Sequence, residues 1–151
     1  MKFFCKVVTV LAVFMLFFAI TSCKNSTSAD DGMTITKLEA PTNLVVNSIV
    51  DTTLIDPTAE VNISFDYNGK FGMATYGILG YSHTNDSSQA IYDSYNSHVT
   101  VEAGENTRTA TIQNFHPVSG RKYYFWLKVT CADYNISDSA WSNVAEFTYI
   151  E

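Results

Sequence analysis

The chain has 151 residues, of which 46% are hydrophobic and 14% aromatic, enough to bury the core of one compact domain. Its formal net charge is −6. Nucleic acids and anionic membrane surfaces attract clustered Lys and Arg, so this acidic balance argues against binding to nucleic acid and against electrostatic adsorption to a membrane.

The first 22 residues have the features of a secretory signal peptide. Lys2 and Lys6 supply a positive start, and residues 7–20 (VVTVLAVFMLFFAI) form an uncharged, mostly apolar run. A membrane-spanning helix needs about 20 apolar residues, so this shorter run predicts a leader, residues 1–22, that is cleaved. Loss of both lysines leaves seven bases against fifteen acids, a balance of −8 for the mature chain.

The end of the leader, Ile20-Thr21-Ser22-Cys23, resembles the lipobox of bacterial lipoproteins at all four positions. The resemblance implies cleavage between Ser22 and Cys23, a diacylglyceryl group on the Cys23 sulfur, and acylation of the new amino terminus by a fatty acid such as palmitate. Each buried methylene contributes about 0.8 kcal/mol, so two or three acyl chains hold a protein on a membrane durably. We therefore expect a covalent lipid on Cys23 as membrane anchor, and no other cofactor.

Residues 23–39 are expected to be the lipidated cysteine and a flexible tether. Residues 24–36 (KNSTSADDGMTIT) are mostly small and polar and lack an apolar period. Lys24, in place of an aspartate, argues against retention in an inner membrane, and Ala29-Asp30-Asp31 resembles the acidic surface-export signals of some bacteria. The sequence thus favours the outer membrane and leaves its periplasmic and surface sides both open.

Residues 40–151 show short runs of alternating apolar residues between turn residues, and no stretch with a helical period. About seven short strands in about 110 residues predict an all-β, immunoglobulin-like sandwich of two antiparallel sheets. We expect a turn at Ala103–Asn106 and strands at Thr42–Val46, Ala59–Tyr67, Ala74–Ser82, Ala90–Tyr95, Val99–Glu102, Thr107–Gln113, Lys122–Cys131 and Val144–Ile150, with the fourth and fifth forming one or two strands.

Two of these segments have a clear period of two, which marks a strand with one face toward the core. In Ala59–Tyr67 the apolar face is formed by Val61, Ile63, Phe65 and Tyr67. In Lys122–Cys131 we expect the odd-numbered residues to face inward and the even-numbered residues, Trp126 among them, to face outward.

The predicted domain resembles the fibronectin type III family. The resemblance rests on Ala40-Pro41-Thr42-Asn43-Leu44 as an opening strand, on residues 115–123 (FHPVSGRKY) as the corner between two strands, on residues 123–129 (YYFWLKV) and on Ser137–Thr148. The sequence departs from the family at Phe65, where a tryptophan is usual, and at Phe115, where a leucine is usual. The resemblance implies one structural role, that of Tyr123 as the corner tyrosine whose hydroxyl bonds to the corner backbone.

The residues that could carry chemistry are scattered. Cys131 is the single cysteine of the predicted domain, so we expect no internal disulfide and a buried thiol at a strand end. The histidines, His83, His98 and His116, lack the spacing of metal ligands or of a catalytic triad. We expect no metal site, no catalytic residue and no enzymatic activity.

The outward face of Lys122–Cys131 carries the aromatic residues that stand out. Tyr124 and Trp126 alternate with Lys122 and Lys128, and Trp141 follows in Ser139-Ala140-Trp141-Ser142. Two interpretations are open. In one, these side chains form a structural cation–π ladder. In the other, Tyr124, Trp126, Trp141 and Lys128 form an exposed platform for a glycan or protein partner.

The function predicted from the sequence is that of a lipid-anchored, non-enzymatic binding or interaction module of the bacterial cell envelope. Its partners are a membrane, reached through the lipid anchor, and an unidentified protein or glycan. The alternative is a glycan-binding accessory lipoprotein that uses the outward aromatic residues.

Overall fold

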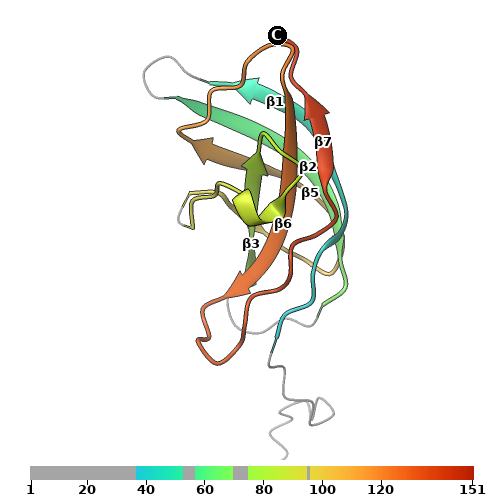
Figure 1. The fold of residues 1–151 in the computed structure, drawn as a ribbon. Coiled ribbons are helices and arrows are strands. Elements are labelled where there is room, and N and C mark those ends of the chain that lie inside the picture. The colour runs from blue at the N-terminus through green and yellow to red at the C-terminus, as the bar shows by residue number, and fades with distance from the viewer. Residues whose placement is uncertain (1–36, 53–56, 70–74, 95) are drawn as a thin grey trace, which may run out of the picture. The chain divides into compact units, whose positions relative to one another are not determined.

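The computed structural model describes residues 37–52, 57–69, 75–94 and 96–151 (Figure 1). The predicted leader, the cleavage point between Ser22 and Cys23, and residues 24–36 of the predicted tether lie outside the described residues.

In the described residues, seven strands form two antiparallel sheets, which confirms the predicted all-β sandwich (Figure 1). One sheet has the order β1-β2-β5 and the other the order β4-β3-β6-β7, the arrangement of an immunoglobulin-like sandwich of the fibronectin type III kind. A short 3₁₀ helix, η1, follows β3. The elements are β1 (Thr42–Asp51), β2 (Thr58–Tyr67), β3 (Thr75–Ser82), η1 (Ser87–Gln89), β4 (His98–Thr100), β5 (Gly104–Gln113), β6 (Lys122–Cys131) and β7 (Ala145–Thr148).

The core lies between the sheets and is formed by the alternating faces that the sequence predicts. In β2, Val61, Ile63, Phe65 and Tyr67 are all at most 2% exposed. β6 has the predicted bounds, and its Tyr123, Phe125, Leu127 and Val129 are fully buried. Each large apolar side chain buried in this way stabilises the fold by about 1.5–3 kcal/mol before the cost in conformational entropy.

Of the one or two strands predicted for Ala90–Tyr95 and Val99–Glu102, the structure forms one, β4, and residues 90–94 form no strand. Ile91 makes only an isolated antiparallel bridge to Tyr81, and η1 precedes it. Asp86 begins η1 because its carboxylate accepts hydrogen bonds from the Ser88 N–H and hydroxyl, at 2.9 and 2.7 Å. This local capping turns the chain where an extended strand would have to start.

The first and last strands of the sequence prediction also have different bounds. β1 continues to Asp51, five residues beyond the expected end, and two register shifts interrupt its pairing with β2. Such irregularities are common in edge strands, which β1 is. β7 is shorter than expected and ends at Thr148.

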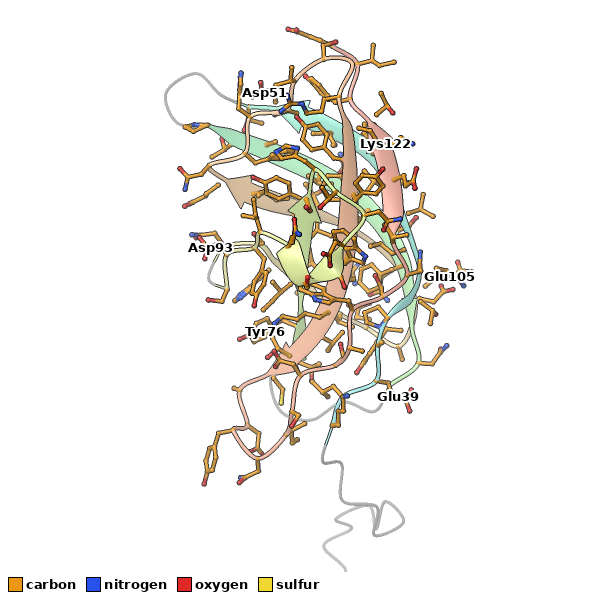
Figure 2. The ribbon with its side chains drawn as sticks, in the orientation of Figure 1. Glu39, Asp51, Tyr76, Asp93, Glu105 and Lys122 are labelled. Atoms are coloured by element: carbon orange, nitrogen blue, oxygen red, sulfur yellow. The ribbon has the colours of Figure 1, made fainter. Side chains whose placement is uncertain are left out.

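The first and last segments of the sandwich lie at opposite ends of β6. Leu38 is buried, and its N–H donates to the carbonyl of Ser137, in the loop that follows β6. Tyr149 instead donates its N–H to the carbonyl of Arg121, just before β6. Glu39 and Asp51 mark the same two ends in Figure 2.

The predicted turn at Ala103–Asn106 is wrong, because β5 already begins at Gly104. Gly104 has a φ of 91°, a conformation that glycine adopts without a steric cost. Asn106 is 2% exposed, and its side chain accepts from the Glu102 N–H at 2.9 Å and donates to the carbonyls of Glu102 and Gly104 at 2.8 and 2.9 Å. Asn106 is therefore a buried residue of β5 whose side chain holds the backbone of Glu102 and Gly104, and the turn lies before it.

Replacement of Asn106 by Ala is expected to lower the free energy of unfolding by roughly 2 kcal/mol, because three part-buried backbone groups of Glu102 and Gly104 lose their side-chain partner. Urea denaturation measures the change. Asn47→Ala, at an exposed position of β1, is the control and is expected to leave the stability unchanged. Equal effects of the two substitutions would contradict the role given to Asn106.

Candidate functional site

Of the two interpretations of the outer face of β6, the exposed aromatic platform requires Trp126 to be accessible, and it is not. Trp126 does lie on that face but is only 4% exposed, and it does not belong to the core cluster between the sheets. Its register partner in β3 is Gly80. A Cβ at Gly80 would lie 3.1 Å from the Trp141 ring and 3.2 Å from the Ala90 side chain, so both residues cover this part of the sheet.

A stack of three side chains forms beside Trp126. The Lys128 Nζ lies 4.5 Å from the centroid of the Tyr92 ring and 5.3 Å from that of Trp141. The two rings meet edge to face with centroids 5.5 Å apart, and Lys128 also pairs with Asp138 at 3.1 Å. Sequence reasoning missed Tyr92, since nothing in the order of residues places it against β6.

The position of Trp141 follows from hydrogen bonds on both sides of it. Ser139 and Ser142 each donate a backbone N–H to a β6 carbonyl, of Val129 and Leu127, at 2.9 and 2.8 Å. Their hydroxyls accept from the N–H groups of the same two residues, at 2.8 and 3.0 Å. The backbone and hydroxyl groups of the two serines thus replace the hydrogen bonds of a neighbouring strand, and they hold Trp141 over the sheet.

The interleaved arrangement corresponds to the structural interpretation of these aromatics. Tyr124, which is half-buried, lies beside Lys122, whose pKa is raised first by its hydrogen bond and ion pair with Glu146 and then by Tyr124. The Trp141 ring contacts Tyr92, and Trp126 is buried. Tyr124, Trp126 and Trp141 therefore do not share one exposed, coplanar surface.

Tyr123 lies at the start of β6, next to the corner that precedes the strand. Its hydroxyl accepts a hydrogen bond from the Val118 N–H at 2.9 Å, and its ring meets Phe115 edge to face at 5.1 Å. The side chain is fully buried. The corner loop is therefore fixed to the core by one phenol.

The other candidate groups lie apart from one another. His83 packs on Tyr123 with ring centroids 5.2 Å apart, and His116 pairs with Asp51 at 3.1 Å. Among the described residues, no three His, Cys, Asp or Glu side chains gather as metal ligands do. Cys131 is partly buried, with its thiol 3.6 Å from the Asp133 carbonyl. No helix in the described ranges has the length and apolar character needed to cross a membrane.

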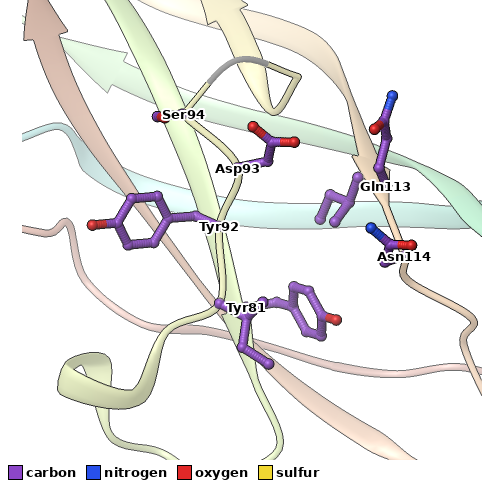
Figure 3. A pocket seen from close by; sticks show the side chains of 8 residues that line it. Tyr81, Tyr92, Asp93, Ser94, Gln113 and Asn114 are labelled. Carbon is purple, nitrogen blue, oxygen red and sulfur yellow. The ribbon is translucent and has the colours of Figure 1, made fainter.

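A groove of about 350 Å³ lies at the side of the sandwich, between residues 91–94 and the end of β5 (Figure 3). Tyr81 points to the side of the groove where Gln113 and Asn114 lie, whereas the Tyr92 ring points the opposite way. The sequence gives no signal for this groove, because its two walls are about 20 residues apart in the chain.

Replacement of Tyr123 by Phe is expected to lower the free energy of unfolding by about 1–2 kcal/mol, because the Val118 N–H loses its acceptor. Thermal or urea denaturation measures it. Tyr134→Phe is the matched control, since Tyr134 is 95% exposed and its hydroxyl is already in water. A Tyr123→Phe protein as stable as the control would mean that the corner hydrogen bond contributes nothing.

Replacement of Lys128 by Met keeps the aliphatic stem and removes the charge between the two rings. The expected loss of stability is about 1 kcal/mol, because the side chain is 15% exposed and contacts two rings and a carboxylate. Lys122→Met is the control, because Lys122 is half-exposed and pairs with Glu146, which is also half-exposed. We expect no measurable change there in a urea titration, and an equal loss in both variants would argue against the stack.

Comparison with models of known protein families gives no match, and comparison with curated proteins gives none either. The function is therefore argued from the residues and geometry of this chain.

Proposed function

We propose that this protein is a lipid-anchored, non-enzymatic binding module of a bacterial cell envelope, held on the outer membrane by acyl chains on Cys23. The observation that carries the proposal is the sequence of residues 7–23, in which an uncharged apolar run ends in four residues like a lipobox. Two or three acyl chains at one cysteine supply an anchor that does not exchange readily.

The geometry of the sandwich suits attachment at one end. Leu38 is buried beside the loop that follows β6, and the C-terminal residues lie at the other end of that strand. Residues 24–36 number thirteen and span at most about 45 Å when extended. A domain tethered in this way can move over that distance and present its far end and its sides to a partner.

Binding is favoured over catalysis by where the titratable side chains lie. His83 packs on Tyr123, His98 lies against the Tyr76 ring at 4.2 Å, and His116 pairs with Asp51. Acid–base or nucleophilic catalysis needs such groups brought together around one reacting atom. The partner in this proposal is a protein or a glycan of the envelope. Glycan binding by Tyr124, Trp126 and Trp141 has less support, because Trp126 is buried.

Palmitate labelling tests the anchor. The full precursor is expressed in a bacterium with lipoprotein-processing enzymes, fed an alkyne analogue of palmitate and separated into membrane and soluble fractions. The wild-type chain is expected to carry the label, to sediment with membranes and to lose the mass of residues 1–22. Cys23→Ala is expected to lose the label and the cleavage.

Cys131→Ala is the matched control, because it removes the thiol of the folded domain and leaves Cys23 in place. It is expected to be labelled and cut like the wild type. An unlabelled wild-type chain, or a label that survives in Cys23→Ala, would overturn the proposal.

A further inference from the structure

The groove beside β5 has the build of a small-molecule site. Its volume of about 350 Å³ falls at the lower end of the range typical of such sites. One wall comes from residues 91–94, which follow the Tyr81–Ile91 bridge, and the other from the end of β5. The groove therefore joins the edges of the two sheets.

The two walls are held together by one side chain. The Asn96 amide donates to Asp93 Oδ2 at 2.7 Å and to Gln113 Oε1 at 3.1 Å. The Ser97 N–H also donates to the Asp93 carbonyl at 3.2 Å. The Asp93 carboxylate and the Gln113 amide are thus oriented before any ligand arrives, which lowers the entropic cost of binding.

Asn114 adds a second amide in an unusual backbone conformation. Its φ is 57°, a left-handed value that asparagine tolerates better than most residues. The next residue, Phe115, is 2% exposed and donates its N–H to the Pro57 carbonyl at 3.1 Å. The backbone after Asn114 is therefore fixed, and the side chain of Asn114 is exposed at the groove.

The floor of the groove is apolar with one polar group. Ile112 is 2% exposed and Tyr81 6% exposed, while Ile91 at the rim is 54% exposed. Burial raises the pKa of the Tyr81 hydroxyl, and nearby Tyr123 raises it further. The phenol therefore stays protonated at neutral pH and can donate a hydrogen bond.

The lining as a whole selects for an uncharged ligand. It combines a carboxylate, two primary amides, a serine hydroxyl and two tyrosines with aliphatic surface, and none of its eight residues is Lys, Arg or His. An anionic ligand would meet Asp93 in a chain of net charge −6. A compact molecule with several hydroxyl groups and apolar C–H faces matches both kinds of surface.

We propose that the groove formed by Tyr81, Ile91, Asp93, Gln113 and Asn114 binds a neutral saccharide. The proposal rests on the proposed function, since it gives a ligand class to a binding module. It places the ligand at the side of the sandwich and away from Trp126 and Trp141.

A peptide strand added to the free edge of β5 fits less well. Arg108 donates from Nε to the Thr100 carbonyl and from Nη1 to the Thr107 carbonyl, both at 3.0 Å. These contacts lie near the middle of β5, and at its C-terminal end Asn96 contacts Gln113. Because side chains occupy the edge at its middle and at one end, little continuous backbone remains for strand addition.

A glycan array tests the proposal with the full-length, detergent-solubilised protein. The array carries neutral hexose and N-acetylhexosamine chains of two to six units beside chains that contain uronic or sialic acid. Retention is expected on neutral members only. Asn114→Gly keeps the backbone conformation, removes the amide and should weaken retention about tenfold, as the loss of one or two hydrogen bonds predicts, and Gln113→Ala should do the same.

Asn43→Gly is the matched control, because Asn43 also has a positive φ, 55°, and lies on β1 far from the groove in the sheet order. It should bind like the wild type, and urea midpoints show that all variants fold. No retention of any neutral glycan, retention of acidic glycans alone, or retention indifferent to Gln113 and Asn114 would overturn the proposal. If the protein carries the palmitate label and sediments with membranes but binds no glycan on the array, only the saccharide site is refuted. If it carries no label, the anchor is refuted instead.

Discussion

Leu127 and Val129 of β6 need hydrogen-bond partners on the side away from β3, and β7 does not reach them. β7 pairs only with Lys122 to Phe125. A buried strand with unpaired N–H and carbonyl groups is costly, about 1–3 kcal/mol for each group left unsatisfied. Ser139 and Ser142 satisfy these groups with both backbone and hydroxyl, and the remaining features of this face follow from that solution.

The serine pairing fixes Trp141, and Trp141 orders its surroundings. Its ring lies over Gly80, where a side chain of any other residue would be crowded. Lys128 and Tyr92 complete the stack on the same face. Because Tyr92 is held there and Ile91 is bridged to Tyr81, Asp93 is carried to the opposite side of the segment, where it forms a wall of the groove. The stack of Lys128, Tyr92 and Trp141 and the proposed saccharide site therefore lie on opposite sides of residues 91–94.

The period of two was sufficient to predict most of the fold. It identified β2 and β6 because each has one face in the core. The apolar residues of that face, such as Val61 and Ile63 in β2 or Phe125 and Leu127 in β6, stand at every second position. It failed for residues 90–94, whose path is decided by the capping of η1 and by the contacts of Tyr92 with distant Trp141 and Lys128. It placed Trp126 on the outer face but left its exposure open, because alternation distinguishes two faces of a strand and does not reveal that a later segment covers the outer one.

The groove could not be predicted for the same reason, since its parts meet only in the folded chain. Its place nevertheless has a physical consequence for an anchored protein. Tyr81 pairs with Phe125, six residues from the end of β6 at Cys131, which at about 3.3 Å per residue is about 20 Å. Leu38 joins the sandwich beyond that end, through Ser137. A ligand in the groove would thus lie well away from the end to which the proposed tether is attached, where a membrane surface obstructs it least.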